Sequence, residues 1–283
     1  MLRMNTPQPC EPILVAHLLR PLEDRLLELL RALSADDWQR PTLAPQWKVR
    51  GVAAHLLDTE LRKLSAVRDR HFPDAPAIAS PADLVAFVNR LNREGVAFYG
   101  RLSPAVLVSL LETASREFCA FHESLDPFSP AVFGVSWAGE SQSLNWFDTA
   151  RELTERWHHQ QQIRLATSRP GIEIPEFLAP VLDCFVRGLP NTYRHTPAAE
   201  GTAIRIDITG DCGGSWFLFR LPTLWMLTRD SFYHPAAQVT MPQSIAWRLF
   251  TKGLAPEEAR DHVVIAGDPV LGEVILHHLA IVG

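Results

Sequence analysis

The central motif of this chain is Glu155-Arg156-Trp157-His158-His159, a Glu-x-x-x-His pair in a segment, about residues 143–167, that we expect to be one helix. On a helix, this spacing places the Glu155 and His159 side chains on one face, a turn apart. His55 lies far upstream, in a second predicted helix of about residues 49–70. Two imidazoles and one carboxylate from two helices can hold a divalent metal with a coordination position left open. An open position is what distinguishes a catalytic metal site from a structural one.

Neighbouring residues compete with these candidates. His158 is three residues from Glu155 and can also reach the metal-facing side of the helix. Glu152 is a weaker competitor of Glu155. A glutamate on a helix more often pairs with a nearby arginine, and a single histidine such as His55 is more often a buried core residue. The spacing of Glu155 to His159 favours a ligand role for that pair.

The pattern of apolar residues divides the chain into a helical part and a mixed part. Helices are predicted over about residues 12–33, 49–70, 80–101, 103–124, 143–167 and 175–190. Strands are predicted over 203–210 and 216–221, joined as a hairpin, and over 237–241 and 263–267, with helices over 242–252 and 269–279. The predicted fold class is therefore an all-helical domain, residues 1–198, followed by a smaller α+β domain, residues 199–283.

Composition excludes several classes of protein. The 283 residues favour two domains, and 47% hydrophobic with 21% charged residues is typical of an ordinary soluble globular protein. A net charge of -5 and the lack of a polybasic run predict no nucleic-acid partner. No apolar stretch reaches the roughly 20 residues of a membrane span. Because Met1–Glu11 lacks the pattern of a signal peptide, we expect a cytoplasmic protein that does not bind a membrane.

Four stretches of the sequence resemble the mycothiol-dependent maleylpyruvate isomerase family. They are Trp38 to Pro41, the run from Trp47 to Leu56 with its Trp-x-Val-Arg-x-x-x-x-His pattern, the Trp137-Ala138-Gly139 loop, and the run from Glu155 to Arg164. The resemblance implies a DinB-like four-helix bundle that binds one divalent metal, commonly zinc. It maps the ligands onto His55, Glu155 and His159. The tail from about 237 to 283 resembles the sterol-carrier-like C-terminal domain of these proteins.

The resemblance also implies a reaction. In the isomerase, the thiolate of mycothiol adds to the cis double bond of maleylpyruvate, the intermediate rotates, and the thiolate is expelled from the trans product. A divalent metal, zinc or else nickel, iron or manganese, lowers the pKa of the bound thiol. The predicted cofactors are thus a metal and mycothiol or another low-molecular-weight thiol, and the predicted partner is a small acidic substrate. Hydrolysis by metal-bound hydroxide and non-enzymatic binding of an apolar small molecule are the alternatives, and the oligomeric state stays open.

Further residues are candidates for support. His158 and Arg164 are candidates near the metal ligands, and Arg220 and Arg248 are candidates for binding the thiol or an acidic group from the C-terminal domain. The family pattern has Asp where this chain has Gln162. If that Asp orients a ligand histidine, its role here is either vacant or filled by another group.

Overall fold

The computed structural model describes residues 7–73, 76–232 and 234–282, in two compact units. Leu14–Gly134 and Gln142–Ile172 form the helical unit, and the chain up to Ile13, Val135–Ser141 and Glu173–Ile281 form the sheet unit. The segment Met1–Glu11, in which no signal peptide is predicted, lies partly outside the described residues. The predicted class, helical residues followed by an α+β part, is confirmed. The domain limits 1–198 and 199–283 stay a prediction, and the residues from 173 to 198 pack within the sheet unit.

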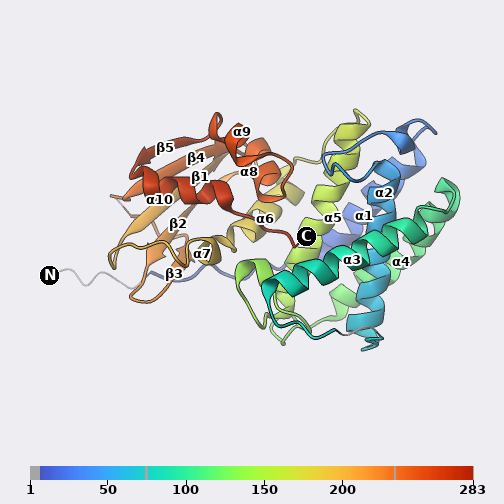
Figure 1. The fold of residues 1–283 in the computed structure, drawn as a ribbon, viewed down its shortest axis with the longest axis horizontal. Coiled ribbons are helices and arrows are strands. Elements are labelled where there is room, and N and C mark those ends of the chain that lie inside the picture. Colours follow the sequence, from blue (N-terminus) through green and yellow to red (C-terminus); the bar gives the residue numbers. More distant parts are fainter. Residues whose placement is uncertain (1–6, 74–75, 233, 283) are drawn as a thin grey trace. The chain divides into compact units, whose positions relative to one another are not determined.

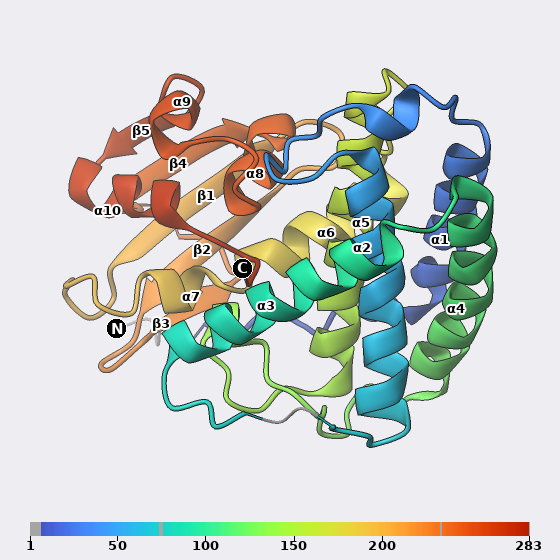
Figure 2. The ribbon, with the colours of Figure 1, turned by 45° about the vertical axis from the view of Figure 1, so that its right-hand side comes forward.

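In the described part of the helical unit, five long helices follow one another along the chain, and Figure 1 labels them. They are α1 (Ala16–Arg31), α2 (Val49–Lys63), α3 (Pro81–Tyr99), α4 (Pro104–Ser124) and α5 (Asn145–Ala166), with a short 3₁₀ turn at Asp37–Gln39 and a π-helical turn at Leu64–Arg68. Helix α1 packs against α4 and α5, and α2 packs against α3, α4 and α5 (Figure 2). Four helices, α1, α2, α4 and α5, thus enclose a common interior, and α3 lies outside against α2.

Local signals fix several helix ends. The Ser80 side chain accepts a hydrogen bond from the Asp83 backbone N–H, and Asp83 accepts one from Ser80, with Pro81 at the first helical position. This capping box confirms the predicted start. The predicted start of the first helix at residue 12 is wrong, because α1 begins at Ala16. Val15 is buried without being helical, so its apolar character reflects burial rather than helix formation.

The interior of the helical unit contains a continuous apolar core. It is drawn from all four enclosing helices and from the 3₁₀ turn, and includes Leu26, Leu30, Trp38, Val52, Leu56, Leu111 and Ile163. Burying one such side chain contributes about 1.5–3 kcal/mol to folding. This core holds α2 and α5 in a fixed relation, which matters because each carries part of the predicted metal site. Among the described residues, no helix is both long enough and apolar enough to cross a bilayer.

The sheet unit contains one five-stranded sheet. Its strands are β1 (Ala203–Thr209), β2 (Gly214–Arg220), β3 (Trp225–Thr228), β4 (Ala237–Pro242) and β5 (Val264–Gly267), in the order β3-β2-β1-β4-β5. Strands β1 and β4 are parallel, and the other neighbours are antiparallel. The helices are α6 (Pro175–Val186), α7 (Leu189–Thr192), α8 (Gln243–Phe250), α9 (Pro256–Arg260) and α10 (Pro269–Glu273), with 3₁₀ turns at Ser136–Ala138 and Val274–His277.

The predicted hairpin is confirmed as β1 and β2, with Ile206 opposite Trp216. Its turn requires glycine at residue 213, because a Cβ there would lie 1.9 Å from the Ile208 carbonyl oxygen. The predicted strands near 237–241 and 263–267 are also confirmed. Strand β3 and helix α9, which have four and five residues, were not predicted. Elements this short carry too few residues to show a period.

A group of charged side chains is buried inside the helical unit. Glu60 is fully buried and Glu23 is 2% exposed. The Ser115 hydroxyl donates to Glu60 Oε1 at 2.9 Å and lies 3.4 Å from Glu23 Oε2. Burial raises the pKa of Glu23 to about 7 despite the Arg156 guanidinium. Burial and the neighbouring Glu23 raise the pKa of Glu60 well above its ordinary value. At neutral pH, at least one of these two carboxyl groups therefore keeps its proton.

These raised pKa values predict a loss of stability at alkaline pH. An unfolded glutamate ionises near pH 4.3, so folding favours the protonated form, and the stabilisation is lost as pH rises through the folded pKa. Glu60→Gln, a neutral side chain of the same shape, should flatten the fall in melting temperature as pH rises above about 6.5. That window lies above the unfolded pKa of histidine, about 6.5, so the buried histidines do not contribute. Calorimetry at several pH values measures the effect.

The matched control for this measurement is Glu112→Gln. Glu112 lies on α4, is ion-paired with Arg31 at 2.7 Å, and its side chain is 52% exposed. It should leave the pH profile of the melting temperature unchanged. A Glu60→Gln profile parallel to that of the wild type would show that Glu60 does not hold a proton in the folded protein.

Candidate metal centre

His55, Glu155 and His159 converge in the helical unit. Glu155 Oε1 lies 2.8 Å from His55 Nε2 and 3.2 Å from His159 Nε2, and the ligand atoms of all three residues lie within 4.8 Å of one another. Donor atoms that share one zinc ion at about 2.0–2.2 Å lie roughly 3–4 Å apart. The three side chains therefore have the spacing of a ligand set, and they come from two helices, as the sequence predicted.

Each helix contributes its ligand from a face that points inward. His55 lies in the middle of α2, flanked by the buried residues Ala54 and Leu56. Glu155 and His159 lie one turn apart on α5. Since α2 and α5 pack against each other, the two imidazoles approach to a ring separation of 4.8 Å. Helix packing, rather than a loop, sets the geometry of this site.

Gln162 contacts the outer nitrogen of His159. Its Oε1 lies 3.0 Å from His159 Nδ1, and both side chains are buried. An amide oxygen can only accept, so this contact is a hydrogen bond when Nδ1 carries the proton, and Nε2 then has a lone pair on the side of Glu155. A lone pair facing a carboxylate oxygen is an arrangement that a shared cation stabilises. Gln162, the residue at which the sequence left an orienting role open, thus lies against a predicted ligand histidine.

Burial and charge give these groups protonation states that suit a metal. Burial lowers the pKa of His55 to about 4, so this imidazole is neutral at neutral pH. Burial alone would raise the pKa of Glu155, but the neighbouring imidazoles of His159 and His55 hold it well below its usual range. An ionised carboxylate therefore lies beside a neutral imidazole. The His55 Nδ1 atom is buried and has no hydrogen-bond partner among the described residues.

One side of the group is apolar and the other is open. The Trp47 ring lies 4.6 Å from the His55 ring and 5.9 Å from the His159 ring. His55 and His159 are 2% and 6% exposed, whereas the Glu155 side chain is 23% exposed. A ligand in solution can therefore approach Glu155, while Trp47 shields the imidazoles from water.

The two competing residues have other contacts. Glu152 Oε1 lies 2.6 Å from Arg151 Nη2 and 3.2 Å from Lys63 Nζ. Burial would raise the pKa of Glu152, but Arg151, Lys63 and Arg156 lower it to about 2. The His158 Nδ1 atom donates to the Thr154 carbonyl oxygen at 2.8 Å, and its ring stacks 4.0 Å from that of His159. Neither residue belongs to the three-residue group, although His158 lies directly beside it.

The arginines predicted to support the site are held by other groups. Arg164 donates to the Gln160 side chain and to the carbonyl oxygens of Pro170 and Arg25, all within the helical unit. These bonds tie the end of α5 to its surroundings. Arg220 and Arg248 belong to the sheet unit, where their guanidinium groups lie 5.8 Å and 5.5 Å from the rings of Trp225 and Trp247. Each of the two has one buried nitrogen without a described hydrogen-bond partner.

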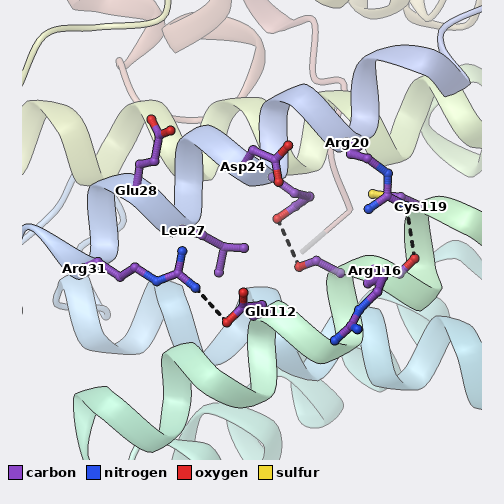
Figure 3. Close-up of a pocket in the computed structure, with 10 residues that line it drawn as sticks. Arg20, Asp24, Leu27, Glu28, Arg31, Glu112, Arg116 and Cys119 are labelled. Atoms are coloured by element: carbon purple, nitrogen blue, oxygen red, sulfur yellow. Dashed lines mark hydrogen bonds and ion pairs between the residues drawn. The ribbon is translucent and has the colours of Figure 1, made fainter.

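A cavity of about 500 Å³ lies elsewhere in the helical unit, between α1 and α4 (Figure 3). Its walls carry charged side chains, and two of these residues donate to other lining residues. Arg31 binds Glu112 at 2.7 Å, and Arg20 donates to the Arg116 carbonyl oxygen at 3.3 Å. None of the predicted site residues lines it. We therefore assign the chemistry to the His55, Glu155 and His159 group rather than to this cavity.

Two functional contacts were missed from the sequence. The i, i+3 spacing of His159 and Gln162 permits the hydrogen bond between them but does not fix it. The buried group around Glu23 and Glu60 also left a signal. Glu23 follows Leu19 by four residues and precedes Leu26 by three, so it occupies the apolar face of α1.

Comparison with known proteins gives one family. The model of the mycothiol maleylpyruvate isomerase N-terminal domain matches residues 19–164, more than half of the chain, and this span contains all three residues of the group. A crystal structure of the mycothiol-dependent maleylpyruvate isomerase superposes with a TM-score of 0.53 at 13% identity, covering 89% of this chain and 91% of that one. A histidine-to-alanine mutant of the isomerase covers the same shares at 13% identity, with a TM-score of 0.49. No curated protein matches the sequence.

The two glutamates of α5 should differ in their effect on stability. Glu152→Gln removes the charge that balances Lys63, Arg151 and Arg156, and breaking a buried ion pair in this way costs about 3–5 kcal/mol of unfolding free energy. Glu155→Gln in metal-free protein keeps a side chain of the same shape beside the His55 imidazole, which burial keeps neutral, and should cost less than about 1.5 kcal/mol. Urea denaturation in the presence of a chelator measures both. Equal losses would mean that Glu155 is a structural ion-pair partner.

Proposed function

The chain belongs to the mycothiol maleylpyruvate isomerase N-terminal domain family, and from this we propose that it is a metal-dependent enzyme that uses a low-molecular-weight thiol. The proposed reaction is cis–trans isomerisation of, or thiol transfer to, a small acidic electrophile such as maleylpyruvate. The observation that carries the proposal is the convergence of His55, Glu155 and His159 around one point, inside the span that defines the family.

The residues present fit a divalent metal, with zinc as the preferred ion. Two imidazole nitrogens and one carboxylate oxygen are the donor set of many catalytic zinc sites. The two short distances to Glu155 Oε1, 2.8 Å and 3.2 Å, bring the three donors together. The Glu155 carboxylate is ionised and the His55 imidazole is neutral, which are the protonation states that a metal requires. We propose His55, Glu155 and His159 as the ligands.

Three protein ligands leave a coordination position for a reactant. When bound, a divalent ion would lower the pKa of a thiol or a water molecule in that position. The protein orients the site through the hydrogen bond between Gln162 and His159, and excludes water through the Trp47 ring. The exposed fraction of Glu155, 23%, supports access from solvent on that side. His158, stacked on His159, is a candidate for supporting the ligand.

We also propose the roles that the family suggests for the two parts of the chain. The helical unit would be a DinB-like bundle that holds the metal, and the sheet unit would be a sterol-carrier-like domain. Arg220 and Arg248 are candidates for binding the carboxylates of the thiol cofactor or the substrate, and each keeps one buried nitrogen without a described partner. An acidic substrate would match such donors.

Metal-dependent hydrolysis is the second candidate function. The donor set of two imidazoles and one carboxylate is equally suited to activating water. Gln162 in place of the family's Asp is the specific observation that favours it, because the thiol reaction is associated with the family's own pattern around the ligands. The two functions share the same ligands and differ in whether turnover needs a thiol.

The metal assignment predicts the metal content of the purified protein. After reconstitution with zinc and gel filtration, we expect about one ion per chain by plasma mass spectrometry. His55→Ala and His159→Ala should each lose it, because two ligands cannot retain the ion through filtration. His122→Ala, which removes a buried histidine of α4 hydrogen-bonded to Thr149, is the matched control and should keep it, with folding checked by circular dichroism. If His159→Ala retained the metal and His158→Ala lost it, the ligand would be His158 and the assignment of His159 would be wrong.

The thiol assignment predicts turnover that depends on two added components. Zinc-loaded protein should isomerise maleylpyruvate only when mycothiol is present, and the thiol should be recovered unchanged because the net reaction moves no atoms between molecules. His159→Ala should reduce the rate by at least about 100-fold. Absorbance spectra or chromatography of the two isomers provides the measurement. Hydrolysis of ester or amide substrates without any thiol would support the second function instead.

A further inference from the structure

We propose that Gln162 is a positioning residue that fixes the tautomer of His159 and so presents the Nε2 lone pair of this histidine to the metal. The inference rests on the proposed metal function and extends it to a residue at which this chain departs from the family pattern. It assigns to a neutral amide the orienting role that a carboxylate often has beside a metal-binding histidine.

The contact that supports the proposal is short and buried. Gln162 Oε1 lies 3.0 Å from His159 Nδ1, and the two residues are 4% and 6% exposed. They are three residues apart on α5, so the helix holds them on adjacent positions of one face. Because water reaches neither side chain easily, the amide oxygen is the acceptor available to the Nδ1 proton. The proton is thereby kept away from Nε2.

The opposite edge of the His159 ring shows why the tautomer matters. Nε2 lies 3.2 Å from Glu155 Oε1. A proton on Nε2 would donate to Glu155 and would leave no lone pair for a metal. Only with the proton on Nδ1 do His159 and Glu155 both offer electron pairs to the same point. Glu155 alone would favour the unproductive tautomer, and Gln162 opposes that preference.

The two ligand histidines are held in different ways. The His55 Nδ1 atom is buried without a described hydrogen-bond partner, and the Trp47 ring packs at 4.6 Å from the His55 ring. His55 is therefore oriented by packing, whereas His159 is oriented by a hydrogen bond. A reversed Gln162 amide would place an N–H group against Nδ1 and force the His159 proton onto Nε2. The orientation of one amide thus decides whether the site can bind a metal through His159.

The test compares two variants at residue 162 with a control at the next residue. Gln162→Met keeps the length of the side chain and removes the acceptor. Gln162→Glu restores an acceptor that cannot donate when ionised. Gln161→Met is the matched control, because Gln161 is also buried but accepts from the Ile172 backbone N–H at 2.9 Å instead of from a histidine. Both methionine variants lose one buried amide, so a general loss of packing affects them alike.

Two readouts are independent of enzymatic activity. Zinc affinity, measured by competition with a chromophoric chelator, should fall about 10–100-fold in Gln162→Met and should be at least as high as that of the wild type in Gln162→Glu. Gln161→Met should retain the wild-type affinity. In zinc-loaded protein, the proton NMR signal of His159 Nδ1–H should be visible in the wild type and in Gln162→Glu, and should be lost by exchange with water in Gln162→Met.

The outcomes separate this inference from the proposed function. A wild-type protein that binds no zinc contradicts both. Zinc bound by the wild type with unchanged affinity in Gln162→Met overturns the role of Gln162 and leaves the metal site standing. A lower affinity in Gln162→Glu than in the wild type would show that an acceptor at residue 162 does not favour metal binding by His159, which also overturns the proposal.

Discussion

The structure depends on the balance of charge along one buried helix. Sixteen of the residues of α5 are buried, and they include Asp148, Glu152, Arg156 and His159. A helix with so many polar groups inside a protein is stable only when each group finds a partner. Lys63 on α2 binds Asp148 at 2.5 Å and Glu152 at 3.2 Å. These ion pairs fix the rotation of α5 about its own axis and its position along α2. They so determine which side chains of α5 meet His55.

Two rows of side chains on α5 have different roles, one structural and one in the proposed metal site. Glu152 and Arg156 are four residues apart and face the ionised interior, where Arg156 Nη2 lies 3.6 Å from Glu152 Oε2. Glu155 and His159 have the same spacing but are offset from that row. Successive residues on a helix are rotated by about 100°. Glu155 and Arg156 are adjacent in sequence but therefore point toward different neighbours. A packed ionic core and a metal-binding group can therefore coexist within two turns.

The sequence predicted the class of the fold from its periodicity and the Glu155 and His159 pair from its spacing, whereas His55 was identified by the resemblance to the family. It could not separate Glu152 from Glu155 by physical argument alone, since that choice depends on the cations of other helices, such as Lys63. It missed β3 because a four-residue strand has no measurable period. It also left residue 162 unassigned, because whether Gln162 reaches His159 depends on side-chain rotamers that spacing permits but does not fix.

The protonation states of His55 and Glu155 are already set in the protein without a metal. Burial keeps His55 neutral, with its pKa lowered to about 4, while its neighbours hold Glu155 ionised. Binding to a group prepared in this way releases few protons, so less of the binding free energy is spent on deprotonating ligands. The same burial makes an uncompensated carboxylate costly. A cation between Glu155, His55 and His159 removes that cost, which is the physical reason for expecting the helical unit to be more stable with a metal than without one.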